Sequence, residues 1–144
     1  IKSIKNRFDY IFKTENKYPG APNIITNVIE NKPFDLSGLE VVPVNVNHHF
    51  VQVFGFRFKD FAYLTDVKTV EDDEIEKLKN LEVLVVNALR IEPHISHFNL
   101  EEALQFIDKV KPKKVYNDLN PNEKALLSGF SGAFGAIASN GLSA

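Results

Sequence analysis

The chain has 144 residues, with 44% hydrophobic and 25% charged residues, which excludes a disordered or collagen-like chain. It contains no cysteine, so a disulfide-stapled scaffold is excluded as well. Its formal net charge of -2 offers no overall positive field that would recruit nucleic acid or an anionic membrane. Because the chain starts at Ile1 rather than at methionine, we interpret it as a fragment or as a chain that has lost a leader or domain.

No targeting or membrane segment is visible in the sequence. Residues 1–17 mix charged with apolar side chains and lack the uninterrupted apolar core of a signal peptide. The longest weakly polar run, residues 125–138, is shorter than the roughly 20 apolar residues that a spanning helix needs. Cytoplasm is therefore the default prediction for localisation.

The first third of the chain predicts a helix followed by short extended segments. Apolar residues recur at helical spacing over residues 3–13 and predict a short amphipathic helix. A turn and breaker cluster at residues 18–22 ends this pattern. Residues 24–29 then form a β-rich run, and residues 33–36 predict a short strand.

The middle of the chain has the most regular pattern. Residues 39–46 predict a strand, and residues 51–58 and 61–64 predict a hairpin across a tight turn. Residues 69–80 predict a polar helix. The nearly continuous apolar run at residues 81–89 is typical of a strand buried on both faces.

The clearest helix signal begins at Asn99. Asn99 is a good N-cap, Glu102 stands at the third helical position, and an apolar stripe continues to Val110 before Pro112 stops the helix. Residues 113–116 predict a further strand. The order of a helix, several antiparallel strands and then βαβαβ predicts an α+β or mixed α/β layer protein.

The last segment, residues 117–144, differs in character from the rest. Apolar residues at helical spacing predict a helix, but four glycines weaken it. A loosely helical tail and a disordered tail are therefore both open.

All four histidines and one aspartate follow predicted strands in short loops: His48, His49, Asp66, His94 and His97. If the strands are neighbours in one sheet, these loops meet at one edge, where imidazole and carboxylate groups are typical of a zinc, iron or manganese site. A single loop histidine or aspartate is more often simply solvated, so the hypothesis depends on the joint pattern. His48 and His49 point to opposite sides of an extended backbone, so only one of them should ligate.

Five stretches of the sequence resemble a known family, and YLTDVK and residues 87–103 are the specific parts. The stretches are GLEVVPVNVNH (38–48), GFRF (55–58), YLTDVK (63–68), LEVLVVNALR (81–90) and HISHFNLEEAL (94–104). They resemble the second half of a metallo-β-lactamase-fold hydrolase of the phosphodiesterase-like subgroup that includes the carbon–phosphorus-lyase accessory phosphodiesterase. This resemblance implies an α+β fold, part of an αββα sandwich with a mixed or antiparallel sheet and flanking helices. It divides the chain into the C-terminal half of such a domain, residues 1–116, and the tail, residues 117–144.

The resemblance implies a role for each matched residue. His48 matches a histidine that binds one metal of a binuclear site, and Asp66 matches the aspartate that bridges both metals. His97 matches a substrate-side histidine that contacts the scissile phosphate or protonates the leaving group. The implied cofactor is a divalent metal, zinc or manganese, and the implied reaction is hydrolysis of a small-molecule phosphodiester by a metal-activated water. For the nearby Lys68 and Arg90, a fold-stabilising charge is favoured over phosphate contact.

The sequence also departs from the family pattern, and these departures argue against an active enzyme. The principal motif, His-x-His-x-Asp-His, belongs to the first half of the fold and occurs nowhere here. The final strand continues into Asn117-Asp-Leu-Asn-Pro instead of a Thr-His-x-x-His run, and His49 replaces a small residue, usually glycine. His48 and Asp66 cannot hold a binuclear centre unless His49 or His97 contributes, so we expect this chain alone to be inactive.

Two function hypotheses follow from this conflict. One is an incomplete metal-dependent hydrolase, and the alternative is a non-catalytic binding or scaffold domain derived from the same fold. The uncovered sheet face of half a sandwich also predicts association, as a homo-oligomer or with a covering segment, through the Phe-rich strand at residues 54–58. Neither nucleic acid nor a membrane is a predicted partner.

Overall fold

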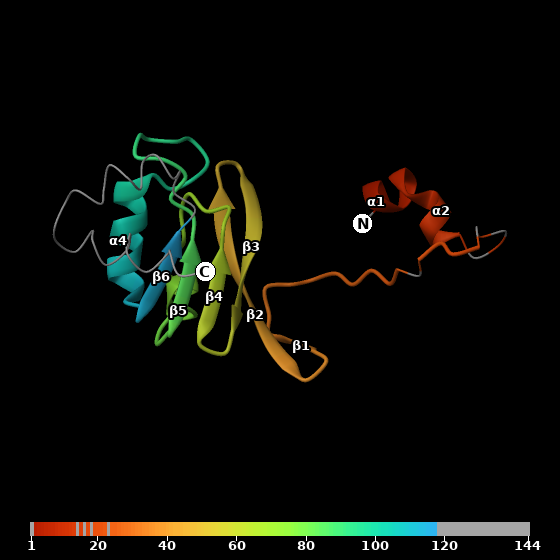
Figure 1. The fold of residues 1–144 in the computed structure, drawn as a ribbon, viewed down its shortest axis with the longest axis horizontal. Helices are drawn as coiled ribbons and strands as arrows, with labels where there is room; N and C mark the ends of the chain where they lie inside the picture. The colour runs from red at the N-terminus through yellow and green to blue at the C-terminus, as the bar shows by residue number, and fades with distance from the viewer. Residues whose placement is uncertain (1, 14, 16, 18, 23, 118–144) are drawn as a thin grey trace. The chain divides into compact units, whose positions relative to one another are not determined.

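The computed structural model describes residues 2–13, 15, 17, 19–22 and 24–117 (Figure 1). It divides into two units, Ile1–Glu30 and Asn31–Ala144. The predicted tail therefore lies outside the described residues, apart from Asn117.

The first unit differs from its prediction in two ways. The expected single helix is two short ones, α1 (Lys2–Arg7) and α2 (Asp9–Phe12), because Phe8 leaves the helical region with φ -121° and ψ 42°. The β-rich run at residues 24–29 forms no strand among the described residues of this unit. Strand propensity expresses itself only where a neighbouring strand and a packed face are available.

A six-stranded sheet forms the second unit, and its strands lie in chain order (Figure 1). The first three pairings are antiparallel and the last two are parallel. This mixed sheet and the hairpin across the Lys59–Asp60 turn confirm the predicted fold class. The strands are β1 (Phe34–Leu36), β2 (Leu39–His48), β3 (Val51–Phe58), β4 (Phe61–Leu64), β5 (Val83–Val86) and β6 (Lys114–Asn117).

Two helices connect the parallel strands. α3 (Asp72–Glu76) is shorter than the predicted helix over 69–80, because the backbone tightens into i→i−3 hydrogen bonds and reverses at Asn80, whose φ is 58°. α4 (Leu100–Val110) has the predicted bounds and ends at Lys111, which has left-handed backbone angles. None of the helices in the described ranges is long and apolar enough to cross a membrane.

The capping box at the start of α4 confirms the sequence prediction. The Asn99 side chain accepts a hydrogen bond from the Glu102 backbone N–H at 2.9 Å, and the Glu102 carboxylate accepts one from the Asn99 backbone N–H at 3.0 Å. Two of the otherwise unpaired N–H groups at the helix start are thereby satisfied. The helix axis is thus fixed directly after the loop that carries His97.

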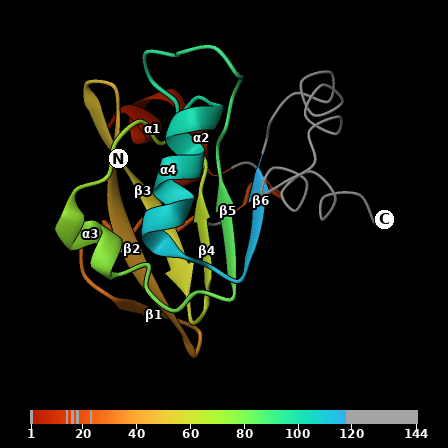
Figure 2. The same ribbon diagram turned by 90° about the vertical axis from the view of Figure 1, so that its left-hand side faces the viewer.

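Both helices pack on one face of the sheet, and Figure 2 shows α4 crossing in front of the strands. Apolar residues of the sheet alternate with the pleat, so every second residue reaches this face. The core joins strand residues to the buried sides of α3 and α4 and includes Val44, Val46, Ala62, Leu64, Ile75, Leu84, Val86, Ala103, Phe106 and Val110.

The opposite face carries a row of side chains that crosses five strands. The strand registers pair the members of this row one after another: Pro43, Phe56, Tyr63, Val85 and Tyr116. Tyr63 is 47% exposed and Tyr116 is 42% exposed. The sheet therefore has one face packed by helices and one with accessible aromatic rings.

Candidate metal centre

Three loops at one edge of the sheet bring the predicted site residues together. Because β2 and β4 are both antiparallel to β3, and β5 is parallel to β4, the carboxyl ends of β2, β4 and β5 lie at the same edge. His48 ends β2, Asp66 follows β4, and His97 lies between β5 and α4. One potential ligand atom from each residue lies within 4.8 Å of the other two. The expected convergence at one sheet edge is confirmed.

The two histidines of this cluster face each other. The ring centroids of His48 and His97 are 4.5 Å apart with planes at 67°, and both residues are half-buried. Within the described part of the chain, the buried Nδ1 atoms of these two rings have no hydrogen-bond partner. A buried polar atom without a partner costs about 1–3 kcal/mol, so these nitrogens are suited to a bound group.

The donor set fits a divalent metal. Two imidazole nitrogens and one carboxylate oxygen are the ligand types of open catalytic zinc sites, which keep a further position for water or substrate. The Asp66 carboxylate is exposed, so this position is accessible from solvent. His48 and Asp66 could hold one ion, and His97 lies close enough either to complete the ligand set or to face a bound substrate.

His49 stands apart from this cluster. It is exposed, its φ is 58°, and its ring lies 3.5 Å from that of Phe50, centroid to centroid. Its left-handed backbone closes the two-residue turn between β2 and β3, since His48 pairs with Val51. This conformation favours glycine and explains why a small residue is expected there. His49 is not a substitute ligand in this arrangement.

His94 supports the loop that carries His97. Its Nδ1 atom accepts backbone hydrogen bonds from Ser96 at 3.3 Å and from His97 at 3.2 Å. Burial, and then the positive charge of Arg90, lower the pKa of His94 below 6.5. A neutral imidazole keeps Nδ1 available as an acceptor. The structure thus gives His94 an orienting role, whereas its loop position predicted a candidate ligand.

The two basic side chains near the motifs, Lys68 and Arg90, form hydrogen bonds within the protein. The Lys68 ammonium donates to both carboxylate oxygens of Glu102, at 2.6 and 2.7 Å. The Arg90 guanidinium donates to the Pro93 carbonyl at 2.8 Å. Both arrangements agree with the favoured structural interpretation of these charges.

A cleft of about 220 Å³ adjoins Asp66. It lies beside the part of β3 that precedes its pairing with β4. Its walls are mostly apolar and aromatic, and they comprise Val46, Val53, Phe54, Gly55, Phe56, Tyr63, Thr65 and Asp66.

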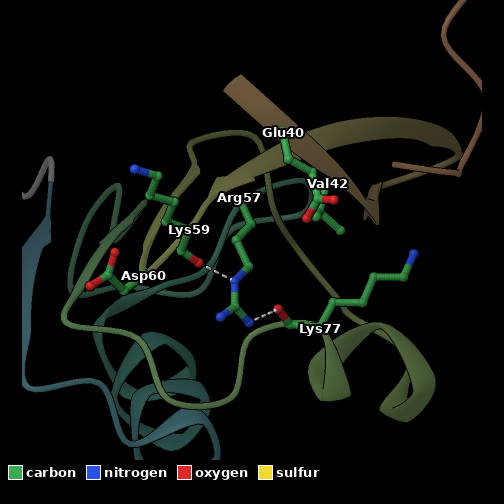
Figure 3. A pocket seen from close by; sticks show the side chains of 6 residues that line it. All are labelled: Glu40, Val42, Arg57, Lys59, Asp60 and Lys77. Carbon is green, nitrogen blue, oxygen red and sulfur yellow. Dashed lines mark hydrogen bonds between the residues drawn. The ribbon is translucent and has the colours of Figure 1, made fainter. Parts of the chain in front are cut away.

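A second hollow, of about 460 Å³, lies at the other end of the strands (Figure 3). Its central side chain is Arg57, which donates hydrogen bonds to the carbonyls of Lys59, Lys77 and Lys79. The guanidinium therefore clamps the β3–β4 turn to the segment after α3. This hollow is a structural junction and contains none of the candidate site residues.

Sequence reasoning missed Asn87, which follows β5. Its side chain is fully buried and hydrogen-bonded to the backbone of Val67 on both sides. The available signal was a single amide side chain inside the apolar run at residues 81–89. A polar residue at such a position needs internal partners, and their identity depends on the fold.

Comparison with known proteins gives one family match and one curated relative. Residues 1–117 match a family model described as "Beta-lactamase superfamily domain". An octanoyltransferase of Porphyromonas gingivalis is 34% identical over 112 residues, which cover 76% of this chain and 23% of that protein.

Solved structures are similar in fold. The crystal structure of a diphosphatase from the PhnP family has a TM-score of 0.70 and 30% identity, covering 81% of this chain and 42% of that one. The metallo-β-lactamase fold protein YhfI from Bacillus subtilis has a TM-score of 0.58 at 13% identity, covering 81% and 49%, a likeness of fold alone. The chain spans less than half the length of each of these relatives.

Proposed function

Because the chain belongs to the β-lactamase superfamily, which its sequence matches over residues 1–117, we propose that it serves metal-dependent hydrolysis of a phosphodiester. The observation that carries this proposal is the convergence of His48, Asp66 and His97 within 4.8 Å at one sheet edge. The 30% identity to a PhnP-family diphosphatase supports the choice of phosphate chemistry. The chain spans 42% of that protein. That the activity of a whole enzyme extends to this chain is therefore itself proposed.

Each residue of the cluster has a distinct proposed role. His48 and Asp66 hold the divalent metal, zinc or manganese. The bound metal would act as a Lewis acid and lower the pKa of a coordinated water. His97, whose ring contacts that of His48, faces the phosphate and passes a proton to the leaving oxygen. His94 accepts a hydrogen bond from the backbone N–H of His97 and so helps to fix the backbone from which this ring projects.

Metal binding is the first test, and the sequence offers a matched control. The full chain is titrated with ZnCl2 or MnCl2 by calorimetry, alongside His48→Gln, Asp66→Asn and His49→Gln. We expect the first two variants to lose at least about tenfold in affinity, as is usual when a metal site is perturbed. His49→Gln should bind like the parent chain, because His49 lies outside the cluster. A parent chain that takes up no metal, or equal losses in all three variants, would contradict the proposal.

Hydrolysis is the second test. Bis(p-nitrophenyl) phosphate with added manganese is the substrate, and His97→Gln should lower turnover more than it lowers metal affinity. An equal loss of both would make His97 a metal ligand and not the proton donor. Absence of both metal binding and hydrolysis would favour the alternative, a non-catalytic binding or scaffold domain.

We also propose that the aromatic row on the open sheet face is covered by a further sheet or by a second copy of the chain. The support is the exposure of Tyr63 and Tyr116 in a row that crosses five strands. Contiguous exposed apolar surface marks interaction sites in soluble proteins.

A further inference from the structure

We propose that Asn87 is a positioning residue that sets the place of Asp66 relative to His97 through the backbone of Val67. This inference rests on the proposed metal-dependent function. It assigns the geometry of the site to a side chain that touches none of the proposed ligands or substrate.

Asn87 holds both ends of the short loop that carries Asp66. Its backbone N–H donates to the Leu64 carbonyl at 3.1 Å, which extends the β4–β5 ladder by one bond. Its side-chain Oδ1 accepts from the Val67 N–H at 2.9 Å, and Nδ2 donates to the Val67 carbonyl at 3.1 Å. Only Thr65 and Asp66 lie between Leu64 and Val67. The exposed residue Asp66 is therefore flanked on both sides of its loop by a residue that is hydrogen-bonded to Asn87.

The same Val67 carbonyl also fixes His97. It accepts the backbone N–H of Phe98 at 2.7 Å, and Phe98 directly follows His97. The Phe98 carbonyl in turn accepts the backbone N–H of Leu89, two residues after Asn87. One carbonyl oxygen therefore receives both the Asn87 amide and the segment that carries His97.

The third arm of the site is tied to the same loop. The Asn47 carbonyl accepts the Lys68 N–H at 2.7 Å, and the Asn47 N–H donates to the Thr69 carbonyl at 2.9 Å. Asn47 directly precedes His48. His48 and His97 thus each have a neighbour in the chain that is hydrogen-bonded to the segment 67–69, and Asp66 directly precedes this segment. The buried Asn87 side chain holds the segment at Val67.

Burial explains why an amide stands at this position. Val86 and Ala88 are both almost fully buried, and Asn87 itself has 0% exposure. A buried amide is costly without partners, and here both of its polar atoms are bonded. A well-packed apolar residue here would give a comparable free energy of unfolding if the Val67 N–H and carbonyl had other hydrogen-bond partners. The amide is therefore best explained by its two hydrogen bonds to Val67.

The test compares three variants of the full chain: Asn87→Leu, Asn87→Asp and Leu81→Ala. Asn87→Leu removes both side-chain hydrogen bonds and keeps a side chain that branches at Cγ. Asn87→Asp retains an acceptor for the Val67 N–H and loses the donor to the Val67 carbonyl. Leu81→Ala is the control, since it opens a cavity at a buried residue that precedes β5, whereas Asn87 follows the other end of this strand.

Two readouts need no metal. Amide hydrogen exchange, followed by NMR, should accelerate at Val67 and Phe98 by about tenfold or more in Asn87→Leu, beyond any change at other core amides. The nuclear Overhauser contact between the His48 and His97 rings should weaken in the same variant. Asn87→Asp should retain more protection at Val67, and it provides the comparison if Asn87→Leu does not fold.

The third readout is zinc affinity, measured by calorimetry with ZnCl2 at a temperature where every variant is folded. We expect about a tenfold loss for Asn87→Leu and no loss for Leu81→Ala. Equal exchange and ring contacts in Asn87→Leu and Leu81→Ala, or altered exchange with unchanged zinc affinity, would overturn the inference. If the parent chain binds no zinc, the proposed function fails, whereas the exchange and ring-contact measurements still decide whether Asn87 positions the two loops.

Discussion

Lys68 and Glu102 form an ion pair that joins the loop carrying Asp66 to the first turn of α4. The ammonium donates to both carboxylate oxygens at 2.6 and 2.7 Å, and the same carboxylate accepts the Asn99 backbone N–H at 3.0 Å. One side chain thus serves as the helix cap and as the counter-charge of the neighbouring loop. The pair thus ties the segment that follows Asp66 to the start of the helix that follows the His97 loop.

Two substitutions at Glu102 separate these two contributions. Glu102→Gln retains a side-chain acceptor for the cap and removes the ion pair, so we expect a loss of less than about 1 kcal/mol in the free energy of unfolding. Glu102→Ala removes both contacts, and we expect it to cost about 1 kcal/mol more than Glu102→Gln. Urea unfolding followed by circular dichroism measures both values. Equal losses would show that the cap contributes nothing.

The acid limb of the stability profile should depend on two carboxylates. Burial raises the pKa of Glu102, but the hydrogen bonds from Lys68 and from the Asn99 N–H, with the charge of Lys68, outweigh it and bring the pKa below 4.5. Burial likewise opposes the lowering at Glu74, where hydrogen bonds from Lys77, Asn31 and the Asn45 N–H prevail.

A carboxyl whose pKa is lower in the folded state stabilises the protein above its unfolded pKa, and this stability is lost as the pH falls through the folded pKa. The contribution of these two carboxylates to the melting temperature should therefore stay level above about pH 5 and be lost below about pH 4.5. In Glu74→Gln and Glu102→Gln the fall should be shallower than in the parent chain. An acid limb unchanged by both substitutions would contradict this assignment.

The turn after His48 has backbone strain at His49 that a substitution can remove. A non-glycine residue at a φ of 58° is disfavoured, so His49→Gly should raise the free energy of unfolding by about 1 kcal/mol. His49→Ala retains the strain and should give no such gain. Thermal unfolding measures both variants, and zinc affinity should stay at the parent value in each. A stabilised alanine variant would assign the effect to the lost imidazole instead.

The close approach of β3 and β4 requires glycine at position 55. A Cβ atom there would lie 2.7 Å from Cγ of Leu64 and 3.1 Å from the Tyr63 carbonyl oxygen. Because Leu64 is fully buried and the Tyr63 oxygen belongs to the backbone, Gly55→Ala should cost about 1–3 kcal/mol in the free energy of unfolding. Leu64→Ala should cost less in the Gly55→Ala background than in the parent chain, which a double-mutant cycle measures. Additive losses would indicate that the two residues do not compete for space.

The aromatic row on the open face should promote association. Tyr63→Lys combined with Tyr116→Lys places two charges on this face, and light scattering after size exclusion should show a lower mass than for the parent chain. Ile95→Lys is the control, because Ile95 is 67% exposed and lies in the loop before α4. A parent chain that is strictly monomeric and unfolds cooperatively would remove the need for a covering partner.

Local patterns in the sequence were sufficient for most of the second unit. Alternation along β3, the tight turn before β4 and the Asn99 cap of α4 all depend on residues close together in the chain. Where the local signal was weak, the prediction was wrong or too long, as for residues 24–29 and for α3. No strand among the described residues pairs with the former, and the backbone reversed at Asn80 in the latter.

The sequence by itself determined which residues could act as metal ligands. Four histidines and one loop aspartate follow segments whose apolar alternation and turn residues predict strands. Only the tertiary structure decided that His48, Asp66 and His97 converge while His49 turns away into a hairpin. It also showed that the buried amide of Asn87 holds the backbone between them. The reason is physical: period and cap signals act over a few residues, whereas the distance between two loops is set by strand direction and by hydrogen bonds between residues 20 or more positions apart.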